Sequence, residues 1–286
     1  MRINTNVASM TAMESSTQVN KELTSSLEKL SSGLRINKAS DDASGLAIAD
    51  KLRTQASSVG QAIANGNSAV ALLQIADKAM AEQSNILDIV KQKLIQAATS
   101  TTSSSGRVAI GKDIQKLLSQ LNNIATQTNY NGMSLLQYGT SDTSGAAALT
   151  FQMGESSTDT IASVAGVASN TSGLSLTTLF NAVSAGAVGT FAASTATTAM
   201  GTIDTALNSL NTWRSDFGSV QNQIESAIRN MSTQQTNIKA AESVIRDVDY
   251  AAESANFNKQ NIIAQAGTFA LSQANQVQQN VLKLLQ

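Results

Sequence analysis

The chain has 286 residues, a formal net charge of −1, and no cysteine, histidine or proline. The absence of cysteine excludes disulfides and thiolate chemistry, and the absence of histidine removes the commonest metal ligand and general base. A net charge so close to zero gives no field that would favour nucleic acid or an anionic membrane. The N-terminal sequence MRINTNVASM lacks the apolar core of a signal peptide, and no apolar run is long enough to predict a membrane span.

Apolar residues that alternate at spacings of three and four predict helices in the first half of the chain. The first covers residues 19–34, is interrupted at Gly33 and precedes a polar turn at 37–42. A second runs from 52 to 94, where the small residues Ala56 and Gly66 on the apolar stripe predict close approach to another helix. A Ser/Thr-rich loop at 99–106 then separates it from a third helix at 110–124.

The middle of the chain has a different composition, with no lysine or arginine between Lys116 and Arg214. The pair Asn131-Gly132 predicts a tight turn. Alternation of apolar and polar residues over 149–153 predicts a short strand, with 158–164 as its antiparallel partner and 154–157 as the hairpin loop. Residues 181–199 predict only a turn or a small cap.

The last third carries an apolar stripe with a strict spacing of seven, which is typical of a helix that buries one seam against other helices. This predicted seam of the outer helices consists of Ile203, Leu210, Phe217, Ile224, Met231, Ile238 and Ile245. The two ends of the chain carry looser apolar stripes, which predict a second packing core. Its predicted residues are Val19, Leu23, Leu27, Leu30 and Leu34 near the start, and Ile262, Ala266, Phe269, Val277, Val281 and Leu284 near the end.

These patterns predict a mainly α fold of long, coiled-coil-like helical rods, with the N- and C-termini side by side and a small β-hairpin region near residues 148–180. Two interpretations remain open on the pattern alone. The chain is either a self-contained helical bundle or a polymer subunit, since two thin terminal helices cannot hide both of their apolar seams in a monomer.

Several segments of the chain resemble bacterial flagellin, the subunit of the flagellar filament. They are MRINTNVASM at the start, LSSGLRINKASDDASGLAIADKL at 30–52, LNNIATQTNYNGMSLL at 121–136 and ESVIRDVDYAAESANFNKQNIIAQAGTFALSQANQ at 242–276. The resemblance implies a short form with little or no hypervariable outer domain. It further implies that 1–42 with 245–286 form an inner coiled-coil domain. Residues 43–180 with 200–244 would form an outer α-helical domain with the hairpin, and 181–199 a short variable connection.

The resemblance also implies a function. The chain would be exported unfolded by the flagellar type III apparatus and would polymerise outside the cell into the filament that drives swimming. Its partners would be copies of itself, an export chaperone, the filament cap and the hook–filament junction proteins, with no cofactor. Two alternatives are a hook–filament junction protein of related architecture and a surface adhesin with a helical stalk.

The acidic residues of the chain offer two candidate sites for chemistry. Asp41-Asp42 is a paired carboxylate in a polar turn, where helix capping explains it better than catalysis. Arg246, Asp247, Asp249 and Tyr250 form a charged cluster that predicts ion pairs more readily than a metal site. Some flagellins resemble zinc peptidases through an HExxH motif, which a chain without histidine lacks, and there is no P-loop or GxGxxG. We therefore expect no catalytic, metal-binding or cofactor-binding residues and no enzymatic activity.

Residues 87–96 match the flagellin segment that a host innate receptor recognises. Strongly recognised family members carry Arg at the position of Ile89 and Glu at that of Gln92, so the resemblance implies weak or no activation of that receptor. The matching residues are Ile89, Val90, Lys91, Gln92 and Leu94. The Ser/Thr-rich segments 99–105, 140–150 and 190–198 are either sites of O-linked glycans, as in many flagellins, or unmodified solvated loops.

Overall fold

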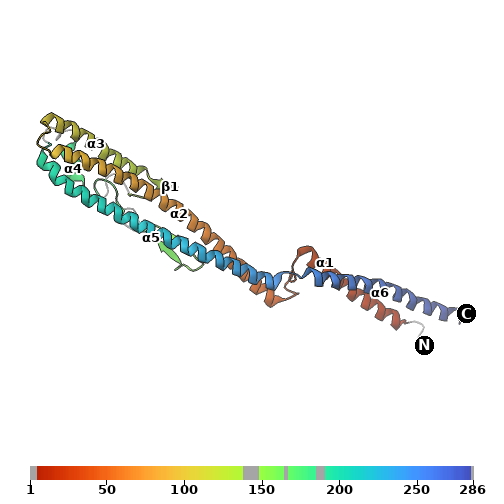
Figure 1. The fold of residues 1–286 in the computed structure, drawn as a ribbon. Coiled ribbons are helices and arrows are strands. Elements are labelled where there is room, and N and C mark those ends of the chain that lie inside the picture. Colours follow the sequence, from red (N-terminus) through yellow and green to blue (C-terminus); the bar gives the residue numbers. More distant parts are fainter. Residues whose placement is uncertain (1–4, 138–147, 164–166, 185–190, 285–286) are drawn as a thin grey trace. The chain divides into compact units, whose positions relative to one another are not determined.

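The computed structural model describes residues 5–137, 148–163, 167–184 and 191–284, with only the backbone of residues 278 and 281–284. Contacts divide the chain into two units (Figure 1). Residues 1–57 and 235–286 form the terminal unit, and residues 58–234 form the central unit. The domains predicted from the sequence have their boundaries after residues 42 and 244. The contacts move these boundaries to 57 and 234, so the terminal unit also includes residues 43–57 and 235–244.

The central unit is built mainly from three long helices. They are α2 (Ala43–Ala98), α3 (Ser104–Gln127) and α5 (Ala193–Arg246). The central unit contains α2 from residue 58 onward and α5 up to residue 234. On α2, Asp77 pairs with Arg214 and Lys91 pairs with Asp204, so α2 and α5 are antiparallel. Lys93 pairs with Asp113, which joins α2 to α3. Each pair is partly solvated and contributes little to stability, but together they set the register of the three helices.

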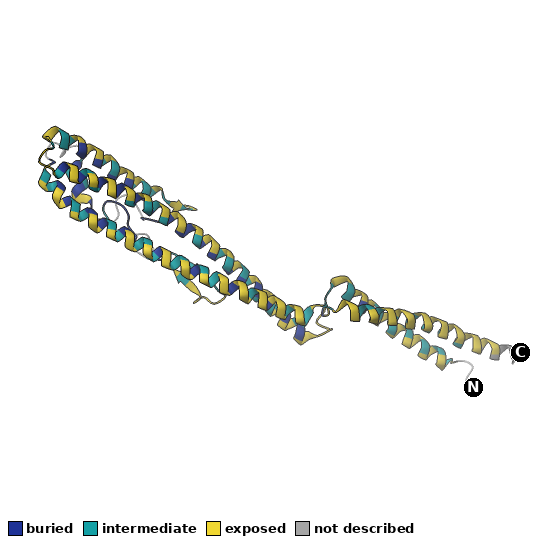
Figure 2. Cartoon of the chain, viewed as in Figure 1, coloured by how far each residue is buried: buried dark blue, intermediate teal, exposed yellow. Residues whose placement is uncertain are grey.

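The core of the central unit lies along the facing sides of these helices (Figure 2). The outer-helix seam predicted from the spacing of seven is buried in this unit at Ile203, Leu210, Phe217, Ile224 and Met231. It continues into the terminal unit, where Ile238 is buried and Ile245 is half-buried. On α2, buried residues recur at alternating spacings of three and four. They are Leu73, Ala76, Met80, Gln83, Leu87, Val90, Leu94 and Ala97. Strong apolar periodicity therefore identified the buried faces of both helices.

Gly66 of α2 lies where two other segments approach the helix closely. A β-carbon placed there would lie 2.8 Å from the Cε atom of Met153 and 2.9 Å from the Cγ1 atom of Ile228 on α5. Both distances are below ordinary van der Waals contact, so only glycine fits without movement of a neighbour. The predicted close approach at this small residue is confirmed.

Two small hairpins belong to the central unit. In the first, β1 (Asn129–Tyr130) pairs with β2 (Met133–Ser134) through Asn131 and Gly132, whose positive φ values of 52° and 80° are typical of a two-residue hairpin turn. In the second, β3 (Thr150–Gln152) pairs antiparallel with β4 (Thr160–Ala162), and Phe151 lies opposite Ile161. The predicted turn and hairpin are both confirmed. The second predicted strand began two residues too early, and its last residue lies outside the described residues.

The predicted connection at 181–199 contains more helix than the sequence suggested. The short helix α4 (Thr177–Val183) extends into it through Val183, and α5 begins at Ala193 rather than near 201. The buried residues Ala196 and Ala199 extend the stripe that continues through Ile203 at spacings of three and four. Alanine gives a weak apolar signal but a high helix propensity, which accounts for the missed turns. Residues 185–190 of this connection lie outside the described residues.

The terminal unit pairs the first helix, α1 (Val7–Ser32), with the last, α6 (Tyr250–Leu284). Asn6 contacts Ala274, and Ser26 contacts Glu253, so the two helices run antiparallel and bring the ends of the chain side by side. The Asn6 side chain caps α1 by accepting from the amide of Ser9, and α1 ends at Gly33 with φ 75°. The predicted fold class, long helices with a small β-hairpin region, is confirmed.

The buried seam of α5 makes a direct stability prediction. Ile224 is fully buried, so Ile224→Ala should destabilise the central unit by about 2–5 kcal/mol through lost burial and a residual cavity. Chemical denaturation of the full chain, followed by helical circular dichroism, measures this change. The matched control is Ile95→Ala at a position 52% exposed on α2, where the loss should stay below about 1 kcal/mol. Equal losses for both variants would contradict the assignment of the core.

Candidate functional site

The α1–α6 pair has a packing seam in which half of the side chains are serine, alanine or glycine. Buried or half-buried positions on both helices recur at alternating spacings of three and four, as in a coiled coil. On α1 they are Ser9, Ala12, Ser16, Val19, Leu23, Ser26 and Leu30. On α6 they are Glu253, Phe257, Gln260, Ala264, Gly267, Leu271 and Ala274. A β-carbon at Gly267 would lie 4.0 Å from Cβ of Ser16, so the helices approach closely there.

Polar contacts supplement this seam at both ends. Asn6 donates from Nδ2 to the carbonyl oxygen of Ala274 at 3.1 Å. Gln260 donates from Nε2 to Oε2 of Glu22 at 2.7 Å, and the Ser26 hydroxyl bonds to the Glu253 carboxylate. Because small and polar residues dominate, the seam buries little apolar area, and hydrophobic stabilisation scales with that area.

The predicted terminal core divides between this seam and the outside of the helix pair. Val19, Leu23 and Leu30 are half-buried in the seam, and Leu34 is half-buried just beyond α1. Leu27 is 53% exposed, Ile262 is 67% exposed and Phe269 is 76% exposed. Ala266 and Val277 are also exposed, while the side chains of Val281 and Leu284 lie outside the described residues. Several large apolar side chains of the pair are thus exposed within one chain, while others of similar size, such as Leu23 and Phe257, are half-buried in the seam; Figure 2 shows the mostly exposed surface of the two helices.

Further exposed apolar residues lie on the same two helices, and the sequence interpretation missed them. They are Val7, Met10 and Met13 on α1, and Ile263 on α6. We call the set of Val7, Met10, Met13, Leu27, Ile262, Ile263, Phe269 and Val277 the outward apolar surface. A spacing of three from Val7 to Met13 could have identified part of it. Burying each of these side chains would yield about 1.5–3 kcal/mol, so their joint exposure is costly for a lone chain.

The end of α1 is joined to the start of α6 by a short backbone bridge. Leu34 and Asp247 form an antiparallel bridge, in which the amide of Val248 donates to the carbonyl of Gly33 at 3.0 Å. The amide of Arg35 donates to the carbonyl of Arg246 at 2.6 Å. We call residues 33–35 with 246–248 the joint. Its backbone bonds hold the two helices in register where their seam ends.

The charged cluster predicted at 246–250 lies at this joint. Arg246 lies 3.7 Å from the carboxylate of Asp50, which confirms an ion pair. Asp249 accepts from the amides of Ala251 and Ala252 and so caps α6. Tyr250 places its hydroxyl 2.8 Å from the position that a β-carbon at Gly33 would take. In the part of the chain that is described, no group of three or more acidic side chains is placed to hold a metal ion.

The paired carboxylates Asp41 and Asp42 have separate structural roles. Asp42 accepts from the amide of Gly45 at 2.9 Å and caps α2, as predicted. Asp41 accepts from the amides of Lys38 and Asn37, and these bonds to the charged form hold the pKa of its carboxyl below the ordinary value. Hydrogen bonding to Glu28 raises the pKa of Lys38. Both groups are solvated and charged at neutral pH, and their hydrogen bonds hold the loop at residues 37–42 closed.

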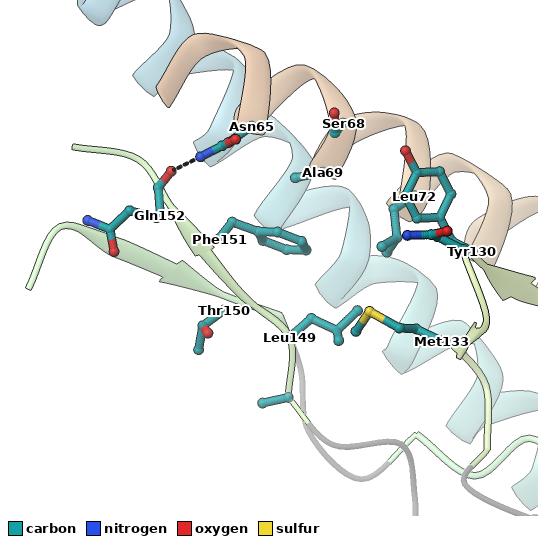
Figure 3. A pocket seen from close by; sticks show the side chains of 12 residues that line it. Asn65, Ser68, Ala69, Leu72, Tyr130, Met133, Leu149, Thr150, Phe151 and Gln152 are labelled. Atoms are coloured by element: carbon teal, nitrogen blue, oxygen red, sulfur yellow. Dashed lines mark hydrogen bonds between the residues drawn. The ribbon is translucent and has the colours of Figure 1, made fainter. Parts of the chain in front are cut away.

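An open pocket of 680 Å³ lies in the central unit between α2 and the two hairpins (Figure 3). Phe151 and Leu149 of the second hairpin point toward Met133 of the first, and Asn65 of α2 donates to the carbonyl of Gln152 at 3.4 Å. The lining is mostly apolar, and its single ionisable side chain is that of Tyr130. This lining offers apolar contact but no paired acid and base.

The segment predicted to match an innate-receptor site lies on α2 of the central unit. Ile89 and Gln92 are exposed, while Val90 and Leu94 are buried in the core. Lys91 is half-buried and pairs with Asp204. Only part of this segment is therefore available to another protein.

None of the helices in the described residues is long and apolar enough to cross a membrane.

Comparisons with known proteins agree with this architecture of paired end helices around a central helical unit. The model of the bacterial flagellin N-terminal helical region matches residues 3–140, and that of the C-terminal helical region matches residues 200–285. The chain is 35% identical to the flagellin of Bacillus subtilis strain 168 over 309 aligned residues, with both chains fully covered. It is 32% identical to the flagellar filament 33 kDa core protein of Treponema phagedenis, again over the whole of both chains.

Two further matches cover only part of one or both chains. The chain is 55% identical to Flagellin B of Helicobacter pylori over 135 residues, which are 47% of this chain but only 26% of that protein. Among solved structures, a putative flagellar hook-associated protein from Vibrio parahaemolyticus matches with a TM-score of 0.57, covering 72% of this chain and 99% of the other. At 11% identity that likeness concerns the fold alone.

The paired terminal helices and the two matching family models define a helical protein of the flagellin type. The chain belongs to the bacterial flagellin family.

The joint predicts a strong effect of a small substitution. Gly33→Ala forces a β-carbon into the left-handed region at a cost of about 1–2 kcal/mol, and the Tyr250 hydroxyl adds a clash. Amide hydrogen exchange at Arg35 and Val248, whose amides bond across the joint, should accelerate by about tenfold or more.

Two controls separate the backbone cost from the clash. Gly132→Ala has the same left-handed backbone with nothing within 4 Å, so exchange at the nearby amide of Leu135 should change less. Adding Tyr250→Phe to Gly33→Ala should remove part of the effect. If Tyr250→Phe gives no relief, the hydroxyl contact does not constrain the joint.

Proposed function

We propose that this chain is a structural subunit of the bacterial flagellar filament and that its outward apolar surface joins it to other copies of the same chain. The exposure of Ile262, Leu27 and Phe269 on a helix pair whose own seam is mostly half-buried carries the proposal. Copies of the chain are the favoured occupant, because α1 and α6 themselves supply two amphipathic faces of the kind that pack in coiled coils.

The proposal assigns two packing roles to two kinds of stripe. The seam from Ile203 to Ile245 packs within the chain, and the outward apolar surface packs between chains. In this view the terminal unit forms the inner part of the filament, as the resemblance implied. The residues proposed for subunit contacts include Val281 and Leu284, which continue the stripe of Val277 in the sequence.

Several features support assembly coupled to folding of the ends. The α1–α6 seam buries few large side chains, so the helix pair gains little stability by itself. Assembly would add the burial that a single chain lacks. We further propose export in an unfolded state through the flagellar type III apparatus, for which a chain without cysteine presents no disulfide. An export chaperone, the filament cap and the junction proteins remain proposed partners.

The alternatives from the sequence are less well supported. A hook–filament junction protein shares this fold, but the full-length relatives at 32% and 35% identity are a filament core protein and a flagellin. A surface adhesin with a helical stalk would need a separate binding head. Residues 58–140 of the central unit instead match the model of the flagellin N-terminal helical region. Filament formation is therefore the property to test.

A charge in the outward apolar surface should block polymerisation without unfolding the subunit. Leu27→Asp would place a carboxylate in an interface between copies, where an unpaired charge is expensive to bury. Leu27 is 53% exposed in one chain, so the variant subunit should fold as the wild type does. We expect no filaments by electron microscopy and no pelletable polymer after salt-induced assembly of purified full-length subunits, with unchanged helical circular dichroism.

The matched control is Ile95→Asp, which makes the same chemical change at a position 52% exposed on α2 of the central unit. This variant should still assemble. Filaments of normal length from Leu27→Asp would contradict the proposed role of the outward apolar surface in assembly. Loss of assembly in both variants would also contradict it, because a charge at an unrelated exposed position would then have the same effect.

We also propose that the chain activates the host flagellin receptor weakly. Ile89 and Gln92 are both exposed on α2, so they can be changed without disturbing the core. The double substitution Ile89→Arg and Gln92→Glu should raise reporter activation by depolymerised subunits at least tenfold. Gln74→Glu, a change at an exposed position of the same helix outside residues 87–96, serves as the control. Full activation by the wild-type chain would refute the proposal.

A further inference from the structure

Three buried side-chain atoms of the central unit have no hydrogen-bond partner among the described residues. They are Oε1 of Gln83, Oε1 of Gln137 and Oγ of Ser169. Gln83 and Ser169 are 0% exposed, and Gln137 is 2% exposed. Buried polar groups are nearly always satisfied, so three such atoms in one unit indicate a missing partner.

The three residues are linked to one another through the backbone around them. Gln83 of α2 donates from Nε2 to two carbonyl oxygens, those of Leu121 on α3 and of Ser169, both at 3.1 Å. The amide of Ser169 donates to the carbonyl of Leu136, the residue before Gln137. These bonds place Ser169 against the Gln83 side chain and beside Leu136, so the three residues with unpartnered atoms are neighbours in the fold, and we call them the polar cluster.

The orientation of the Gln83 amide is fixed by chemistry. Both of its observed partners are carbonyl oxygens, which can only accept, so the atom bonded to them must be the NH₂ nitrogen. Oε1 of Gln83 consequently needs a donor, as does Oε1 of Gln137. The Ser169 hydroxyl has one proton and can satisfy only one of these two oxygens directly.

We propose that a single ordered water molecule occupies this cluster and completes its hydrogen bonding. Water would donate one proton to each of the two amide oxygens and accept the proton of the Ser169 hydroxyl. This uses three hydrogen bonds, the usual number for a buried water. A metal cation fits less well, because all three atoms are neutral and a buried charge without a counter-charge is unfavourable.

The water site would tie a loop to the helical core. Residues 167–171 carry little regular structure, yet the described part of this segment is buried. Its backbone is held by Gln83, by Leu136 and by Asn122, whose Oδ1 accepts from the amide of Thr171 at 2.8 Å. A bridging water adds a link from this segment to Gln83 and to Gln137 at once.

A structure of the wild-type chain that resolves ordered water gives the direct test. We expect one isolated density peak within hydrogen-bond distance of all three atoms, in a crystal of the full chain or in its filament. An empty site, or a Ser169 hydroxyl that bonds directly to one glutamine with the other oxygen unpaired, would overturn the proposal. Coordination distances near 2.0–2.6 Å would identify a cation instead and would also overturn it.

A double-mutant cycle tests the coupling in solution. Ser169→Ala and Gln137→Met each remove one contact to the water, so each should lower the thermal midpoint of the full-length subunit by roughly 2–4 °C or more. The double variant should lose less than the sum of the two, because both changes disrupt the same water. Gln120→Met, on the exposed face of α3, should have little effect. Additive losses from Ser169→Ala and Gln137→Met would contradict a shared water.

Discussion

The packing of α1 against α6 through small side chains is the interaction on which the behaviour of this chain depends. Serine, alanine and glycine let the two helices approach closely, but they bury little apolar surface. Many large apolar residues of the same helices, among them Leu27, Ile262 and Phe269, are exposed instead. A helix pair of this kind is incomplete as a folded object, and further copies of the chain are the natural source of the missing burial. The central unit, by contrast, has a core of its own.

Much of the central unit could be predicted because its buried positions are large and strictly periodic. Ile203, Leu210 and Ile224 lie seven or fourteen residues apart, and all are fully buried. The turn at Asn131-Gly132 followed from backbone chemistry that few other residue pairs allow. The start of α5 was missed because Ala196 and Ala199 fill the same stripe with side chains that periodicity of large apolar residues does not detect.

The terminal unit shows why apolar spacing alone is insufficient where two packing surfaces coexist on one helix. On α6, Ile262 and Phe269 gave the more visible pattern, yet the face toward α1 consists of Phe257, Ala264 and Gly267 with their neighbours. The joint was equally hidden, since the bridge from Leu34 to Asp247 is formed by backbone groups that every residue type carries. The cluster around Gln83 could not be inferred from sequence at all, because a buried glutamine is indistinguishable from a surface one until its neighbours are known.

The small-residue seam of α1 and α6 has a thermodynamic consequence for the chain. If most of the free energy that orders these helices comes from neighbouring copies, their order is linked by mass action to the concentration of subunits. The ends would then be loosely held in a dilute chain and firmly held in a polymer, with a sharp change near a critical concentration. The same sequence could thus pass through a narrow channel as a pliable strand and become rigid where copies accumulate, without any chemical switch.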